Sequence, residues 1–217
     1  MRWSFRLKMM TVLLLAIAVG ACGTGAPSTV GSKSPPFKPS SDARKDLGDS
    51  LRKLSTAFPY RLTETTTTSS AGQSDAQQTR VVEFAAADRF HVKLSGGQGE
   101  DLEMITIGDK GYTKENGKWS EEPANSRRPT KSELEKDLAD AIKDVSLVGP
   151  EKVNGIECFA YNYTIQFDAV KGSGKTWLRA SDGLPLQSDS EFKAETYESK
   201  SHVIYEYNAD VKIEPPK

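Results

Sequence analysis

Hydrophobic and polar residues alternate along most of the chain, which is the pattern of β-strands that bury one face. The clearest run lies in residues 158–167, where every second position is apolar or aromatic: Phe159, Tyr161, Tyr163, Ile165 and Phe167. Because side chains at alternate positions of a strand point to the same side of the sheet, one face of this strand is apolar throughout.

Shorter segments of the same kind follow one another, and most are joined by tight turns. The expected strands cover residues 60–68, 80–86, 89–94, 102–107, 111–114, 118–119, 147–153, 158–167, 176–180, 184–192 and 202–213. Asn116-Gly117 is the strongest hairpin signal, because both residue types tolerate the positive φ angles of a type I′ turn. Residues 154–155 and 181–183 are further expected turns, whereas the glycine-rich residues 96–99 and 172–174 are expected in loops.

A first helix is expected before residue 59. Its apolar positions recur at intervals of four, three and four: Leu47, Leu51, Leu54 and Phe58. The helix should start near Ser40 or Ser41 and end before Pro59. We expect its apolar face to pack on a sheet, since a helix lying on a membrane would need a more basic polar face and larger aromatic side chains.

A second helix is expected after Pro129. Thr130 and Glu133 have the spacing of a capping box, in which each residue binds a free backbone N–H of the first helical turn. One side of this helix would be apolar through Leu134, Leu138, Ala141, Ile142 and Val145. We expect that side to cover one face of the sheet.

Together these elements predict an α+β fold. An antiparallel sheet of about ten or eleven strands must bury one face, and the two amphipathic helices are available to cover it. The expected architecture is a strongly curved sheet, or half barrel, wrapped around the two helices.

The start of the chain has a different pattern. Arg2, Arg6 and Lys8 precede a short apolar run at residues 11–19, which is typical of a secretion signal. The run is about ten residues long, well short of the roughly 20 that a membrane-spanning helix needs, so we expect the signal to be removed.

The closing tetrapeptide Val19-Gly20-Ala21-Cys22 resembles the lipobox of bacterial lipoproteins. That resemblance implies a diacylglycerol anchor on Cys22 and a membrane as partner. It places the protein in the cell envelope on the extracytoplasmic side, at the outer membrane if the organism has one. The expected organisation is a cleaved signal over 1–21, a lipidated cysteine with a flexible Gly/Ser/Pro linker over 22–41, and one domain over 42–217.

The charge balance argues against nucleic acid as a partner. Residues 1–21 hold three basic and no acidic residues, so 26 basic and 30 acidic residues remain, a net charge of about −4. These charges are interspersed, whereas binding to phosphates needs a basic stripe.

The chain also lacks the residue sets of metal sites and of common enzymes. His91 and His202 are isolated, so we expect no metal and no cofactor. Residues 172–176 end like a phosphate-binding loop, but Ala169 stands where that motif needs glycine, and no serine-hydrolase elbow occurs. We therefore expect a protein that is not an enzyme. If Cys22 carries lipid, Cys158 has no partner within the chain and is either buried in the core or joined to another thiol.

Three short motifs, in this order, resemble the superfamily of the lipoprotein carriers LolA and LolB, the mycobacterial LppX-type lipoproteins and the sensor domain of RseB. They are Gly111-Tyr112 with 116–119 (Asn-Gly-Lys-Trp), Gly155-x-x-Cys158-x-x-Tyr161, and Thr176-Trp177-Leu178 with 182–186 (Asp-Gly-Leu-Pro-Leu). The resemblance covers about residues 42–213 and implies a half barrel that encloses an apolar cavity for acyl chains, without catalytic residues.

An acyl-binding cavity would need apolar residues on the inner face of the sheet. The candidates are Val82, Phe84, Phe90, Val92, Met104, Trp119, Ile165, Phe167 and Trp177. Each could instead belong to an ordinary packed core, and the two tryptophans could close one end of the sheet. The leading hypothesis is a membrane-anchored lipoprotein that binds a lipid or an acylated protein for transfer or sensing. The alternative is a scaffolding lipoprotein with a filled core that binds another envelope protein.

Overall fold

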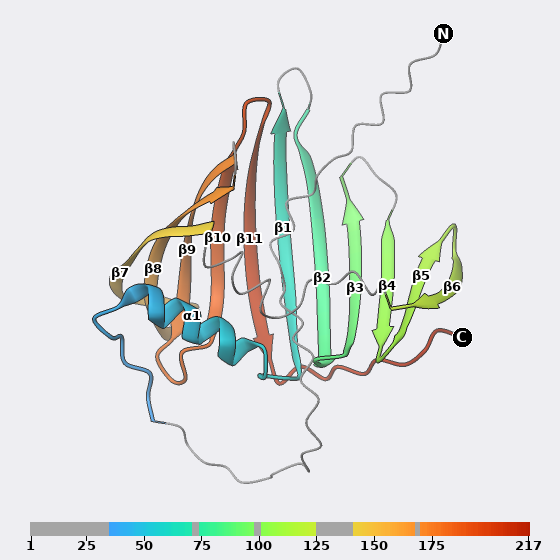
Figure 1. Ribbon diagram of the computed structural model, residues 1–217, viewed down its shortest axis with the longest axis horizontal. Coiled ribbons are helices and arrows are strands. Elements are labelled where there is room, and N and C mark those ends of the chain that lie inside the picture. Colours follow the sequence, from blue (N-terminus) through green and yellow to red (C-terminus); the bar gives the residue numbers. More distant parts are fainter. Residues whose placement is uncertain (1–34, 71–73, 98–100, 125–140, 168–169) are drawn as a thin grey trace.

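The computed structural model describes residues 35–70, 74–97, 101–124, 141–167 and 170–217. Eleven strands form one antiparallel sheet (Figure 1). The strands are β1 (Tyr60–Ser70), β2 (Ala76–Ala86), β3 (Arg89–Gly96), β4 (Leu102–Ile107), β5 (Lys110–Glu115), β6 (Lys118–Pro123), β7 (Ile142–Val153), β8 (Ile156–Phe167), β9 (Val170–Arg179), β10 (Pro185–Lys193) and β11 (Tyr197–Tyr207).

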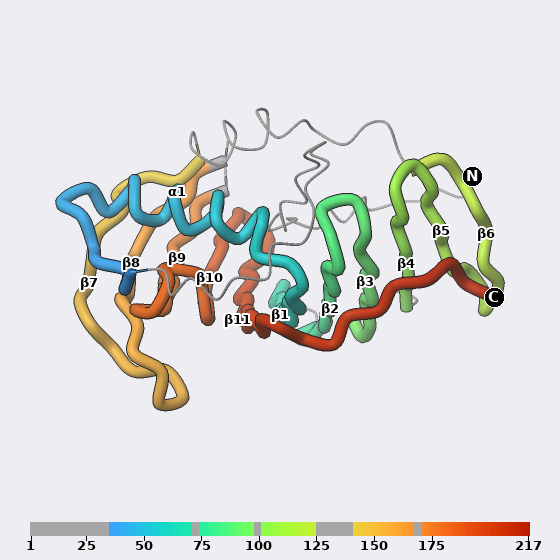
Figure 2. The backbone as a smooth tube through the Cα atoms, turned by 90° about the horizontal axis from the view of Figure 1, so that it is seen from below, coloured from blue at the N-terminus to red at the C-terminus, as the bar shows by residue number. Residues whose placement is uncertain are grey.

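The chain builds the sheet outward from its centre and then inward again. The strand order is β6-β5-β4-β3-β2-β1-β11-β10-β9-β8-β7, so the first six strands run from the middle to one edge. The next five start at the opposite edge and return until β11 pairs with β1. Because β6 and β7 lie at opposite edges, the sheet is an open, curved trough (Figure 2). The predicted curved antiparallel sheet is confirmed.

Helix α1 (Ala43–Leu54) lies across the concave face of the trough, where it packs on β7 and β10 (Figures 1 and 2). It begins two or three residues later than predicted, because Asp42 is the N-cap and its carboxylate accepts a 3.0 Å hydrogen bond from the Lys45 N–H. The helix ends at Leu54, and β1 starts directly after Pro59.

The second predicted helix falls largely on residues 125–140, which lie outside the described residues. Its expected last turn is wrong, because Ile142 and Val145 belong to strand β7. Ile142 pairs with Ile165 of β8, which gives its backbone partners in the sheet, and its side chain is buried in the same cluster as Leu47 of α1. In the part of the chain that the structure describes, α1 is the one complete helix and Ala141 is a helical residue directly before β7, so the second helix itself stays a prediction.

The glycine-rich residues 172–174, predicted to form a loop, lie inside strand β9. The reason is close packing: a Cβ on Gly174 would lie 2.3 Å from Cζ of Tyr163, and one on Gly172 would lie 2.6 Å from Cδ1 of Phe192. The two rings thus occupy the space above the glycines on the concave face, which explains why residues without side chains are suited to this strand.

The last strand was predicted at residues 202–213 but spans Tyr197–Tyr207. Its pairing with β1 ends where β1 begins, at the pair Tyr60 and Tyr207. Asn208 then adopts a left-handed φ of 58°, and its N–H donates to the Pro59 carbonyl at 3.2 Å. This turn redirects residues 208–217, here called the C-terminal segment.

The C-terminal segment runs along the convex side of the sheet, opposite α1 (Figure 2). Its Ile213 is buried against Ile105 of β4 and Tyr112 of β5. Ile105 lies directly opposite His91 of β3 and Tyr112 of β5, so these three side chains are on the same face of the sheet. Each face of the trough therefore has its own apolar contacts.

Candidate functional site

A cavity of about 100 Å³ lies between α1 and the middle of the concave face. Four of its lining residues belong to α1 and the others to strands on both sides of the β1–β11 junction. The lining is formed by Leu47, Ser50, Leu51, Leu54, Tyr60, Leu62, Arg80, Ile142, Tyr163, Ile165, Thr176, Pro185, Ser188, Ser190, Val203 and Tyr205.

The sequence places α1 over this cavity through its apolar stripe. Leu47 is buried with Ile142, Tyr163, Ile165 and Phe192, and Leu54 is buried in a second cluster with residues of β1, β2 and β11. The two ends of the stripe are thus packed on the sheet, and the cavity lies along the helix face between them.

Contacts around both ends of α1 fix its position. Near the N-terminus the Asp46 carboxylate accepts a buried 2.9 Å hydrogen bond from the Tyr161 hydroxyl and another of 2.9 Å from the Ser40 N–H. Near the C-terminus the Lys53 ammonium donates to the Asp182 carbonyl at 2.9 Å and lies 5.6 Å from the centre of the Phe37 ring. The wall of the cavity is therefore attached to the sheet by specific polar contacts.

Phe37 falls in the segment expected to be a flexible linker. Its N–H donates to the Ala180 carbonyl at 2.9 Å, and its ring meets Phe159 edge-on at 6.0 Å. The ring also lies over Gly183, where a Cβ would be only 2.7 Å from it. Residues just before α1 are thus part of the folded domain.

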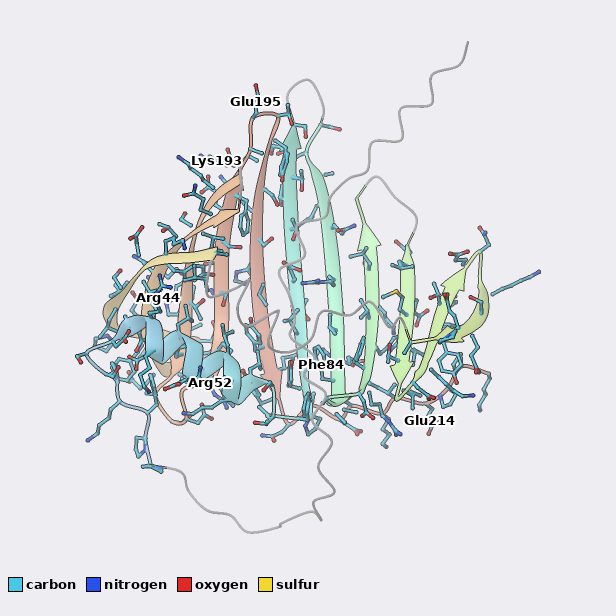
Figure 3. The ribbon with its side chains drawn as sticks, in the orientation of Figure 1. Arg44, Arg52, Phe84, Lys193, Glu195 and Glu214 are labelled. Carbon is cyan, nitrogen blue, oxygen red and sulfur yellow. The ribbon has the colours of Figure 1, made fainter. Side chains whose placement is uncertain are left out.

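On the central strands β11, β1 and β2 the concave face changes from apolar to polar along the strands, whereas beyond the polar rows it is apolar again at Ile142, Ile165 and Phe192 of β7, β8 and β10. At the α1 end of the sheet, cross-strand pairs align Tyr60 with Phe84 and Tyr207, and Figure 3 shows Phe84 at this end, while Lys193 and Glu195 lie at the other. The next row contains Leu62, Val82, Val92, Met104 and Tyr205.

The third and fourth rows carry polar groups. In the third row, Glu64 of β1 lies between Arg80 of β2 and Val203 of β11. Val203 in turn lies opposite Ser188 of β10, and Ser188 lies opposite Thr176 of β9. The fourth row contains Thr66, Ser201 and Ser190. The cavity spans this boundary, since Leu62 and Tyr60 line it on the apolar side and Arg80, Ser188 and Thr176 on the polar side.

The charged pair in the third row is well shielded from solvent. Arg80 and Glu64 are joined at 2.6 Å, and their side chains are 14% and 8% exposed. A buried ion pair of this kind contributes little net stability, but removing one partner leaves a charge that costs about 3–5 kcal/mol. The pair thus presents a polar surface with no net charge to the cavity.

Hydroxyl groups make up most of the remaining polar lining. Thr176 and Ser188 are linked at 3.0 Å across β9 and β10. Burial raises the pKa of Tyr163 and of Tyr205, so both phenols stay protonated at physiological pH.

Ser50 is the exception among these hydroxyls. It is 2% exposed, and its Oγ has no hydrogen-bond partner among the residues that the structure describes. A buried hydroxyl without a partner costs about 1–3 kcal/mol, so its presence in the cavity wall calls for an explanation.

Apart from the two tryptophans, the predicted cavity residues divide into three groups. Ile165 lines the cavity. Val82, Phe84, Phe90 and Val92 lie on the same concave face in the adjoining apolar cluster, and Met104 continues that face opposite Val92. Phe167 is the last residue of β8, and its side chain lies outside the described part of the structure.

Neither tryptophan lines the cavity, because both lie on the convex face. Trp119 packs with Ile105, Tyr112 and the C-terminal segment. Trp177 is buried against Cys158 and Ala160, and its indole N–H donates to Glu151 at 2.6 Å. Cys158 is accordingly a buried thiol.

Sequence reasoning missed the polar members of the site. The signal was present in the alternation: Glu64 and Thr66 share a face with Leu62, just as Thr176 shares one with Leu178. A strand pattern alone, however, does not distinguish a polar inner row from a solvent-facing one.

The histidines lie outside the cavity. His91 is on the convex face, opposite to Phe90 and Val92, and its side chain is only 14% exposed and lies 2.9 Å from Glu103 and 3.6 Å from Glu83. His202 contacts Asp189 at 2.6 Å at the surface. Within the described ranges, no cluster of His, Cys, Asp or Glu has metal-binding geometry.

Among the helices in the described ranges, none is both long enough and apolar enough to span a bilayer.

No family model matches the sequence, and no curated protein matches it. Solved structures do resemble the fold. LprF from Mycobacterium bovis aligns over 83% of this chain and 99% of its own, at 13% identity and a TM-score of 0.50. The lipoprotein LppX from Mycobacterium tuberculosis aligns over 79% and 98%, at 11% identity and a TM-score of 0.45. The LprF match shows that this chain and LprF share a fold.

Proposed function

We propose that this chain is a lipid-anchored envelope protein without enzymatic activity that binds an acylated ligand between α1 and the sheet, for transfer or sensing. The observation that supports it is the cavity that remains on the concave face after α1 has packed. Much of its lining consists of leucine, isoleucine and valine side chains, which favour a hydrocarbon chain over water.

The size of the cavity limits what it can hold in this conformation. An apolar cavity of about 150 Å³ binds one benzene-sized molecule, and the space here is about 100 Å³. It therefore accommodates a short part of an acyl chain. A longer chain would enter along the apolar rows toward Val82 and Val92, or after a movement of α1.

The anchor is the second part of the proposal. Residues 1–34 lie outside the described residues, so the cleaved signal over 1–21, the lipidated Cys22 and the predicted linker as far as residue 34 rest on the sequence. The rest of the predicted linker, residues 35–41, is described, and its Phe37 packs on the domain. A diacylglycerol holds a protein firmly, since each buried methylene contributes about 0.8 kcal/mol. The ligand-binding domain would then work within reach of one membrane.

Two neighbouring substitutions test ligand binding. Val203 lines the cavity, whereas Ile204 points to the opposite face and is 41% exposed. The full chain should co-purify with lipid or bind oleate, as seen by native mass spectrometry after removal of detergent. Val203→Trp should abolish that binding because the indole fills the cavity, and Ile204→Trp should leave it unchanged. A wild-type chain that never retains an acyl ligand would exclude the proposal.

The anchor has an independent test. Wild type should incorporate labelled palmitate and fractionate with membranes, and Cys22→Ala should lose the label. If wild type takes up no label, the lipoprotein assignment fails while ligand binding stands.

The scaffolding alternative is supported by a different observation. Leu147 and Val148, consecutive residues of the edge strand β7, are 40% and 49% exposed, and two large apolar side chains are thus exposed at one edge of the sheet. If the cavity proves too small for any chain, this edge becomes the leading candidate for binding another envelope protein.

A further inference from the structure

The polar residues that line the cavity indicate which polar group the ligand carries, and the apolar residues do not. Arg80, Ser188 and Thr176 lie in one row across the sheet, and the fourth-row Ser190 lies beside them. A pure hydrocarbon would leave these groups without interactions from the ligand. An acyl ligand whose chain lies along the apolar row at Leu62 and Val82 would meet them with its polar end.

The charge at this point is balanced. The guanidinium of Arg80 lies 2.6 Å from the Glu64 carboxylate, and both side chains are largely buried. An additional carboxylate near Arg80 would also approach Glu64 in a medium of low dielectric constant, where like charges repel strongly. The surrounding groups are hydroxyls, which can donate to and accept from an uncharged oxygen.

Ser50 provides the second, independent observation. Its Oγ is buried in the cavity wall and has no hydrogen-bond partner among the described residues. A serine in a helix usually bonds back to a carbonyl of the preceding turn, and this one does not. An orphaned hydroxyl in an otherwise leucine-lined helix face is the expected feature of a group that meets a polar atom of a ligand.

We infer that the site, if it binds an acyl chain as proposed above, recognises an uncharged polar end group, an ester or a hydroxyl, and discriminates against a free carboxylate. Ser50 contacts that group from α1, and the Arg80–Glu64 pair with the third-row hydroxyls faces it from the sheet. The ligand class is therefore an acyl ester such as an acylglycerol or the glyceride portion of an acylated protein.

The test compares two probes with the same hydrocarbon chain. Radiolabelled glycerol mono-oleate and oleate are equilibrated with the full chain, freed of detergent, below their aggregation concentrations at pH 7.4. Wild type should bind glycerol mono-oleate about tenfold more tightly, which corresponds to one well-placed hydrogen bond plus the unfavourable approach of two carboxylates.

Single substitutions then test which residues produce the preference for glycerol mono-oleate over oleate. Ser50→Ala should weaken glycerol mono-oleate about fivefold and leave oleate unchanged. Ser55→Ala is the matched control, because Ser55, the C-cap residue of α1, is also buried but donates to the Arg52 carbonyl at 2.7 Å and does not line the cavity. Glu64→Gln, which leaves Arg80 positively charged without its partner carboxylate, should improve oleate binding about tenfold.

The outcomes separate the two proposals. If wild type binds neither probe, ligand binding itself is wrong. If wild type binds both and prefers oleate, or if neither Ser50→Ala nor Glu64→Gln shifts the ratio, the cavity still binds acyl chains but the recognition of an uncharged end group is overturned.

Discussion

The two halves of the sheet bury their apolar surface in different ways. In the half formed by β7–β11, a helix covers the concave face. In the half that ends in β4–β6, the C-terminal segment covers the convex face. The helix leaves a cavity beside it, whereas the extended segment places Ile213 directly onto Ile105 and Tyr112.

The difference follows from the shapes of the covering elements. A short α-helix is nearly straight, so it contacts a trough at separated points, and α1 does so at β7 and β10. Space remains where the sheet curves away from the helix. An extended chain has no such rigidity, and alternate side chains can follow the surface below it. The cavity is therefore a geometric result of covering a concave face with a helix.

The largest effect should come from filling the concave face of the helix-covered half. In Gly172→Val, the new side chain would collide with the Phe192 ring and with the Glu191 carbonyl, 2.9 Å from the Cβ position. Phe192 supports Leu47 in the cluster under α1. We expect a loss of about 3 kcal/mol in the free energy of unfolding, measured by urea denaturation.

Ser173→Val is the matched control for that variant. Ser173 is the next residue of β9, points to the opposite face and is exposed. Valine favours strands, so this variant should be neutral or slightly more stable. Equal losses in both variants would mean that strand β9, and not the concave face, is the sensitive element.

These glycines also show what the sequence could not reveal. The alternation over residues 158–167 predicts β8 correctly, and the Asn-Gly dipeptides mark two turns whose asparagines both have a φ of 51°. Gly172 and Gly174 were assigned to a loop because local propensity disfavours glycine in strands. Their role depends on Phe192 and Tyr163, which come from neighbouring strands and are invisible to local patterns.

The cavity was predictable only in part for a similar reason. The α1 stripe and the one-sided apolar strands indicated a buried concave face, and Ile165 was identified within it. The prediction that Trp119 and Trp177 line the cavity is wrong, because one residue of register decides the face of a strand, and both fall on the convex side.

A smaller effect is expected in the half of the sheet that ends in β4–β6, here called the tail-covered half because the C-terminal segment covers its convex face. Ile213→Ala removes buried side-chain volume from the contact with Ile105 and Tyr112 and should lower the free energy of unfolding by about 2 kcal/mol. Lys212→Ala, at the exposed neighbouring position, should cost nothing measurable. Because the contact lies on the convex face, oleate binding should be the same in both variants and in wild type. A loss of binding in Ile213→Ala would show that the two faces are coupled.

The smallest effect concerns the convex face of the helix-covered half, which the C-terminal segment does not contact among the described residues. Here the buried Trp177 side chain packs on the sheet, and Glu151 accepts hydrogen bonds from the Lys175 ammonium at 2.8 Å and from the Trp177 N–H at 2.6 Å.

The Lys175 hydrogen bond and then that of Trp177 lower the pKa of Glu151. Since the folded pKa lies below the unfolded value of about 4.3, Glu151 stabilises the fold above that pH, and the stabilisation is lost as the pH falls through the folded pKa.

Glu151→Gln should therefore be less stable than wild type at pH 7 and indistinguishable from it near pH 3, as measured by urea denaturation at both pH values. Glu157→Gln is the control, because its partner Lys152 is exposed and a surface ion pair of this kind contributes little. A difference for Glu151→Gln that persisted at pH 3 would mean that the shape of the side chain, and not its charge, holds Trp177. Side-chain packing alone would then cover the convex surface of this half, as it does in the tail-covered half. The two halves would differ only on their concave faces.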